Sequence, residues 1–200
     1  MVNNTALTEG PPARVRADII AAATRVFSER GYHAASMSEI AEAVGIRKPS
    51  LYHHVRKKED LLFAIHEQMI EELMEETMAV TSSSASPAEK VRETLKVAMR
   101  FVSRNQDAVT VFLAEHRALS GARWNEIVVK RDLYEKMVHR IIADGISSGA
   151  FVDVSPGIAA KGILAMANWG YTWFEPGGPR SADEIAEIFA TIALRGLEVR

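Results

Sequence analysis

The sequence predicts an all-α protein, and three observations carry that prediction. Apolar residues recur at the three- and four-residue spacing of one helix face, for example Leu61, Leu62, Ile65, Met69 and Leu73. S-x-x-E patterns begin at Ser36, Ser86 and Ser181, and in this pattern serine and glutamate together cap a helix N-terminus. No segment of any length alternates apolar and polar residues with the period of two that a half-buried strand shows.

Capping serines, prolines and glycines predict where each helix begins and ends. Pro87 and Pro156 follow serines and suit the first position of a helix, where the missing N–H costs nothing. Gly31, Gly45 and the run Pro176-Gly177-Gly178-Pro179 mark helix ends. The expected helices are 12–30, 37–44, 48–54, 58–80, 87–105, 107–119, 122–148, 156–174 and 182–197. Residues 1–10 are expected to form a disordered tail.

The composition excludes several classes of protein. With 200 residues, of which 48% are hydrophobic and 25% charged, the chain can bury a globular core. It contains no cysteine, which excludes disulfides, thiolate catalysis and sulfur-ligated zinc. No apolar run approaches the roughly 18 residues of a membrane helix, and the first residues lack the features of a signal peptide. We therefore expect a soluble cytoplasmic protein with no membrane partner.

The charge is distributed unevenly along the chain. The net charge is −2, yet residues 47–58 carry five cations and no acid, with two histidines among them. A short basic patch on an acidic body is typical of a small DNA-contacting module. An ordinary solvated helix end would explain the same charges equally well.

The basic patch coincides with a helix-turn-helix outline. Two short expected helices, 37–44 and 48–54, are joined by three residues that begin with Gly45, which can supply a left-handed turn. The second helix opens with Arg47, Lys48, Pro49 and Ser50. The N-terminal residues of a recognition helix are those that meet base edges. This pattern favours DNA binding.

A longer pattern of spaced residues runs without gaps from Arg16 to Leu61. Its members include Ile19, Ala22, Ala23, Phe27, Gly31, Tyr32, Ser36, Ile40, Ala41, Gly45, Ile46, Leu51, Tyr52, His54 and Lys58. This pattern resembles the N-terminal domain of the TetR family of bacterial transcriptional regulators. Three positions depart from the family pattern. Ala35 stands where Thr is usual, Pro49 where Gly or Ala is common, and Val55 where Phe is usual.

The resemblance implies roles for individual residues at a DNA operator. Ser36 and Ser38 would touch phosphates. Arg47, Lys48 and Ser50 would face the major groove, where Arg or Lys can donate to guanine. The remaining implied DNA contacts are Pro49, Tyr52, His53, His54 and Lys58. Of these, Lys58 would bond a phosphate at a helix N-terminus, and Pro49 lacks the N–H for a main-chain contact. Tyr52 as a packing residue and His53 as a solvated one remain alternatives.

The resemblance also implies two domains and a homodimer. Residues 1–57 would form the helix-turn-helix DNA-binding domain, and residues 58–200 an effector-binding and dimerisation domain. The last two helices, 156–174 and 182–197, would pair across the dimer. Such a dimer would bind a palindromic operator, most simply as a repressor, and a mainly apolar small molecule would release it.

The segment 168–179, with its Trp169-Gly170-Tyr171-Thr172-Trp173 run, is similar to one in regulators of lipid and steroid catabolism that sense acyl-CoA thioesters. Candidate ligand contacts are aromatic or charged residues of the expected bundle: Phe101, Phe112, His116, Trp124, Arg131, Trp169 and Trp173. Trp169 and Trp173 would share one helix face, either in a dimer seam or on a cavity wall. Glu115 and Arg131 are expected either to form a half-buried ion pair or to be exposed at the surface.

No sequence pattern indicates an enzyme, a metal or a cofactor. There is no H-E-x-x-H, no nucleophile elbow, no P-loop and no dinucleotide fingerprint. Two alternatives to an acyl-CoA-responsive repressor stay open. One is a regulator that senses drugs or other hydrophobic ligands, and the other is a helical small-molecule binding protein without a specific DNA function.

Overall fold

The computed structural model describes residues 11–199, so the tail expected at 1–10 lies outside the described residues. Their regular structure is helical, with one isolated bridge between Phe151 and Glu198. The elements are α1 (Pro11–Arg30), α2 (Met37–Val44), α3 (Lys48–His54), α4 (Lys58–Thr81), α5 (Pro87–Arg104), α6 (Gln106–Ala114), η1 (His116–Ala118), α7 (Gly121–Ser147), α8 (Pro156–Asn168), η2 (Trp169–Thr172) and α9 (Ala182–Leu197). The all-α prediction is confirmed. In the described range, no helix is both long and apolar enough to span a membrane.

The predicted helix starts agree with the structure because their signals are local. Ser36, Ser86 and Ser181 each accept a hydrogen bond from the backbone N–H of the glutamate three residues on, and that glutamate's carboxylate accepts one from the N–H of the cap. Gly45 ends α2 with φ 77°, and its N–H donates to the carbonyls of Ala41 and Glu42. This left-handed conformation turns the chain directly into α3.

Two expected helices end earlier than predicted. The expected helix 107–119 stops at Ala114 and continues as the 3₁₀ turn η1, because the His116 ring caps the Leu113 carbonyl. The expected helix 156–174 stops at Asn168 and continues as η2. There the side-chain amide of Gln106 donates to the Phe174 carbonyl at 2.9 Å and to the Tyr171 carbonyl at 3.4 Å, which stabilises the turn.

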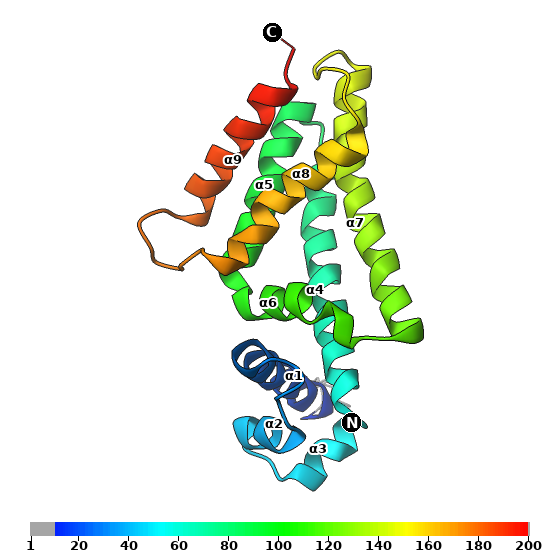
Figure 1. Cartoon of the computed structure of the whole chain (residues 1–200), viewed down its shortest axis with the longest axis vertical. Coiled ribbons are helices and arrows are strands. Elements are labelled where there is room, and N and C mark those ends of the chain that lie inside the picture. The colour runs from blue at the N-terminus through cyan, green and yellow to red at the C-terminus, as the bar shows by residue number, and fades with distance from the viewer. Residues whose placement is uncertain (1–10, 200) are drawn as a thin grey trace, which may run out of the picture.

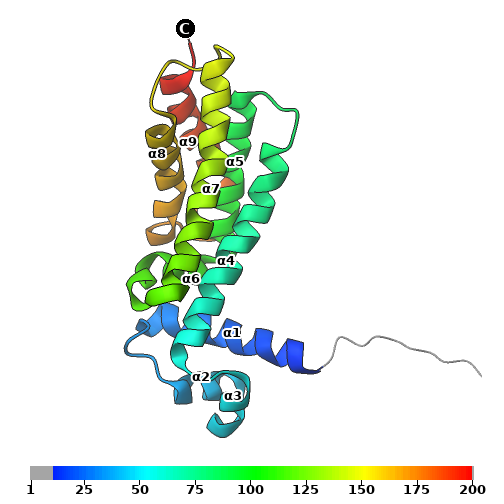
Figure 2. The ribbon, with the colours of Figure 1, turned by 90° about the vertical axis from the view of Figure 1, so that its right-hand side faces the viewer.

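The helices form a small head and a long body (Figures 1 and 2). The head consists of α1, α2 and α3. From it α4 runs into the body, where α5 and α7 lie alongside it and α6 crosses at the base, against α1. On one side of the body α9 packs on α5 and α8. One buried cluster runs without a break from Ile19 and Leu51 in the head to Leu164 in the body, so both parts share a core along α4.

Candidate functional site

The tip of the head is a polar surface held by a small apolar core. Ile40 and Ala41 of α2 and Leu51 of α3 are buried, and they fix the angle between the two short helices. On the outer side of this unit the expected DNA-contacting residues are all exposed: Ser36, Ser38, Arg47, Lys48, Pro49, Ser50, Tyr52, His53 and His54. Tyr52 is 46% exposed, which disfavours the alternative that it is mainly a packing residue. The helix-turn-helix thus presents a basic face to solvent.

Lys58 differs from the other expected DNA contacts. Its Nζ donates to the carbonyl oxygens of Tyr32 at 2.5 Å, Ala35 at 2.8 Å and His33 at 3.2 Å, and it lies 4.4 Å from the centre of the Tyr32 ring. An ammonium has three donors, and these carbonyls take all of them. The structure therefore contradicts the expected phosphate contact and makes Lys58 the residue that ties the α1–α2 loop to α4.

We expect Lys58→Met to lower the free energy of unfolding by about 1–3 kcal/mol, because three carbonyls lose a charged donor. Operator affinity should fall as the support of α2 loosens. The dependence of affinity on salt should keep its slope, since the ammonium faces no phosphate. Urea unfolding and salt titrations of DNA binding measure both effects. Lys57→Met is the matched control. A slope reduced by about one unit per half-site at unchanged stability would restore the phosphate role.

Three polar links connect the head to the body. Ser28 in α1 donates to Asp107 of α6 at 2.9 Å. The backbone N–H of Tyr32 donates to the Glu115 carboxylate at 2.9 Å. Arg123 in α7 pairs with Asp60 at the start of α4. Burial would raise the pKa of Asp60, but this pairing and the backbone donors outweigh it and lower the pKa.

The predicted pair between Glu115 and Arg131 is wrong. Glu115 turns to the head, where its carboxylate accepts a hydrogen bond from the backbone N–H of Tyr32. Arg131 instead lies over aromatic rings, 5.6 Å from the centre of Phe112 and 6.0 Å from that of Trp124. Within residues 11–199 its guanidinium has no carboxylate partner.

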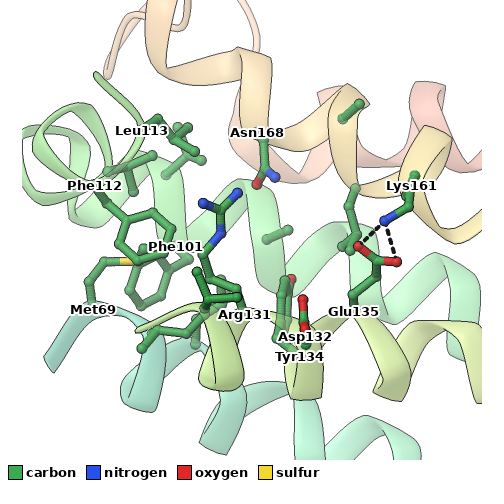
Figure 3. A pocket seen from close by; sticks show the side chains of 18 residues that line it. Met69, Phe101, Phe112, Leu113, Arg131, Asp132, Tyr134, Glu135, Lys161 and Asn168 are labelled. Atoms are coloured by element: carbon green, nitrogen blue, oxygen red, sulfur yellow. Dashed lines mark hydrogen bonds and ion pairs between the residues drawn. The ribbon is translucent and has the colours of Figure 1, made fainter. Parts of the chain in front are cut away.

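A cavity of about 430 Å³ lies in the body between α4, α5, α6, α7 and α8. Met69, Phe101 and Phe112 gather at one end of it, and Lys161 with Glu135 lies at the other (Figure 3). Lys161 Nζ is 2.5 Å from Glu135 Oε1, so this charge is paired. The exposed side chains of its lining belong to α7 and α8, which places the mouth of the cavity between these two helices.

The structure brings three of the seven expected ligand contacts into this cavity: Phe101, Phe112 and Arg131. His116 and Trp124 lie behind them, with ring centres 5.8 Å apart, and Trp124 supports the Arg131 guanidinium. Trp169 and Trp173 do not line the cavity and are 64% and 44% exposed. The prediction that both indoles lie on one face of a single α-helix is wrong, because α8 ends at Asn168, before either tryptophan.

Sequence reasoning did not select the polar residues of α7 and α8 that complete the lining. These are Asp132, Glu135 and Lys161. A spacing pattern in the sequence could have identified them. The lining residues 128, 131, 132 and 135 of α7 have the same spacing as the lining residues 161, 164, 165 and 168 of α8. Each set lies on one helix face. Nothing in the sequence says that these two faces meet.

The chemistry of the cavity follows from this lining. Apolar and aromatic side chains close its deep end, while the guanidinium of Arg131 points into its middle near Asn168 (Figure 3). A charged donor without a protein partner favours an anionic or strongly polar acceptor. The cavity therefore suits a mainly apolar molecule with one such group. Across the described residues, no group of three acidic or histidine side chains could hold a metal ion.

A further surface of the body is apolar. α8, η2 and α9 leave large side chains exposed, and we name this surface the α8–α9 face. Its residues are Ile158 (68% exposed), Trp169, Ile188 and Ile192 (57% exposed). Apolar surfaces of this kind mark protein interaction sites.

Comparison with known families gives two matches that together cover most of the chain. Residues 19–65 match the model of bacterial regulatory proteins of the tetR family. Residues 84–197 match the model of the tetracyclin repressor-like C-terminal domain.

Individual relatives agree with these matches. The HTH-type transcriptional repressor KstR2 of Mycolicibacterium smegmatis is 26% identical over 192 residues, which cover 95% of this chain and 94% of that protein. The crystal structure of PfmR from Thermus thermophilus is similar with a TM-score of 0.84 and 30% identity, covering 90% of this chain and 99% of that one. AibR in complex with isovaleryl coenzyme A and operator DNA has a TM-score of 0.82 and 30% identity, covering 89% and 97%. These relatives are transcriptional regulators, not enzymes.

Proposed function

The chain belongs to the TetR family of bacterial transcriptional regulators, and from that premise we propose how this DNA-binding, ligand-responsive regulator works. In the proposal, a homodimer acts in the cytoplasm as a repressor on a palindromic operator. A mainly apolar molecule with an anionic or thioester group enters the cavity of each protomer and releases the DNA.

The exposed face of α3 supports the DNA part of the proposal. Arg47, Lys48 and Ser50 open the recognition helix and would contact base edges, with Arg47 or Lys48 reading guanine. Other exposed residues of the head would follow the phosphate backbone: Ser36, Ser38, Tyr52, His53 and His54. The short basic face agrees with a specific module better than with general attraction to DNA, because the whole chain has a net charge of −2.

The α8–α9 face supports the homodimer. A twofold axis through this face would place α8 and α9 against their copies and bury the exposed apolar side chains of both protomers. It would also fix two recognition helices relative to each other. They must lie about 34–36 Å apart to enter successive major grooves, so any change in this distance changes operator affinity.

The observation that carries the effector part is Arg131, a guanidinium without a carboxylate partner in the described structure, facing an apolar cavity. At about 30 Å³ for each water-sized group, 430 Å³ holds roughly fourteen such groups. That volume fits an acyl group, while the nucleotide of a coenzyme A thioester would remain outside the α7–α8 mouth. The likeness to AibR, whose complex contains isovaleryl coenzyme A, supports this chemical class.

We expect acyl-CoA thioesters to release a DNA fragment from upstream of the protein's own gene. Arg131→Met should bind these ligands about 10- to 100-fold more weakly, since a hydrogen bond to a charged group is lost, and should bind DNA as before. Fluorescence anisotropy of labelled DNA and calorimetry of ligand binding measure the two steps. Lys130→Met is the matched control, because that cation lies next to Arg131 on α7, is already paired with Glu67 and Glu71 and does not line the cavity.

Other outcomes separate the alternatives. Release by neutral or cationic drugs, unchanged in Arg131→Met, would favour a sensor of hydrophobic compounds and contradict the acyl proposal. Ligand binding without preference for the upstream fragment over random DNA would favour a small-molecule binding protein without a specific DNA function.

A further inference from the structure

We propose that Met69 is a gate between the effector cavity and a second cavity, which takes the apolar end of effectors too long for the first. This inference rests on the proposed function. The second cavity has a volume of about 440 Å³ and lies between the head and the body. Its walls come from α1, α4, the α5–α6 corner and Pro176. It is therefore at the junction where a bound molecule would touch both the DNA-binding helices and the effector domain.

Two residues, Met69 and Phe101, line both cavities. Both are buried, at 5% and 1% exposed, so they form the wall between the two spaces. They lie at the end of the effector cavity opposite Lys161 and Glu135 (Figure 3). A molecule whose polar group pairs with Arg131 and whose tail points away from the mouth therefore reaches this wall.

Met69 is the member of the wall that can move. Both residues belong to the same buried cluster, but the unbranched side chain of Met69 has three rotatable bonds and repacks readily, whereas the ring of Phe101 is rigid. Beyond the wall the second cavity has a mixed lining: Ile65 is buried with Ile20 and Ala108 beside it, while the charged side chains of the lining, such as Arg25, Glu72 and Arg104, are exposed. A hydrocarbon tail that displaces the Met69 side chain would reach the buried, apolar part of this lining.

Occupation of the second cavity would act directly on the head. Thr24 and Arg25 of α1 and Asp107 of α6 line it, and Asp107 accepts the hydrogen bond from Ser28 that ties α1 to the body. A tail between α1 and α6 would separate these groups. Chain length would then determine how strongly an effector releases DNA, in addition to how tightly it binds.

The test uses saturated acyl-CoA thioesters with four to eighteen carbons, with calorimetry for binding and anisotropy for operator release. For the wild type we expect affinity to rise by up to roughly fourfold for each buried methylene, and to continue rising for tails that pass Met69. Met69→Phe should stop the gain at a shorter chain and weaken the longest chains by more than about tenfold, while chains too short to reach the wall lose much less. Met69→Ala should let long chains release DNA at lower concentrations.

Controls separate the gate from general damage. Leu73→Phe narrows the first cavity only, because Leu73 lines it and not the second, and should weaken all chains that reach it. Unfolding curves and operator affinity without ligand establish that each variant is intact. Should Met69→Phe fail to fold, Met69→Leu keeps the volume with a stiffer, branched side chain and should shift the chain-length limit in the same direction.

The outcomes are distinguishable. If acyl chains bind and the Met69 variants change all lengths alike, or none, the gate is overturned while the proposed function stands. If the wild type binds no chain of any length, the proposed function fails, and the gate fails with it.

Discussion

Ile192→Asp is expected to convert the dimer into monomers and to lower operator affinity by at least about a hundredfold, which corresponds to nearly 3 kcal/mol. Ile192 is 57% exposed on the α8–α9 face. In a twofold dimer the substitution would bury two carboxylates of the same sign without partners, at a cost of several kcal/mol. A monomer contacts one half of a palindromic site and loses the contacts of the other.

Sedimentation velocity measures the first effect, and titration of the full operator measures the second. Val129→Asp is the matched control, because Val129 is also an exposed apolar residue, 58% exposed, but lies on α7. It should leave both the dimer and the affinity unchanged. A dimeric Ile192→Asp variant with normal operator affinity would exclude the α8–α9 face as the interface.

Sequence alone predicted the helices well where the signal was local. The starts of α2, α5 and α9 follow from Ser-Glu capping boxes, in which both partners lie within three residues. The early ends of α6 and α8 were not predictable in this way. The turn after α8 is held by a residue far along the chain, since Gln106 donates to the Phe174 carbonyl. At the end of α6 the His116 ring bonds the nearby Leu113 carbonyl, but Glu115 is held by the distant Tyr32.

The candidate sites show the same limit. Residue type was enough to select Phe101, Phe112 and Arg131, which line the cavity. It left Trp169 with two alternatives, a dimer seam or a cavity wall, and the structure places this residue outside the cavity, on the outer face of the body. Lys58 has the charge and the helix position of a phosphate contact, yet its ammonium is used inside the head. Only the packing of one helix against another separates such roles.

His66 is expected to make the protein unstable in acid. The residue lies on α4, is 0% exposed and packs against Phe112 with ring centres 5.1 Å apart. The pKa of its imidazole is lowered to about 4, mainly by burial and in smaller part by the nearby charges of His116 and Arg131, although a hydrogen bond from Nδ1 to the Leu62 carbonyl at 2.9 Å opposes this shift.

The direction of the pH effect follows from the two states. In the unfolded chain a histidine has an ordinary pKa of about 6.5, so between pH 6.5 and 4 the unfolded state binds a proton that the folded state does not. Stability is complete above pH 6.5 and falls as the pH drops towards 4. At about 1.4 kcal/mol for each pKa unit, the loss from this one residue is roughly 3 kcal/mol.

Urea unfolding at about pH 7, above this window, and at about pH 4.5, near its lower end, measures the loss of unfolding free energy. In His66→Leu the difference between the two pH values should be smaller than in the wild type by most of that amount, because leucine cannot take up a proton. His139→Leu, at an exposed position of α7, should behave like the wild type. Since His66 packs on Phe112 at the wall of the effector cavity, its protonation would also disturb the ligand site. An equally steep acid loss in His66→Leu would mean that other groups carry the pH dependence.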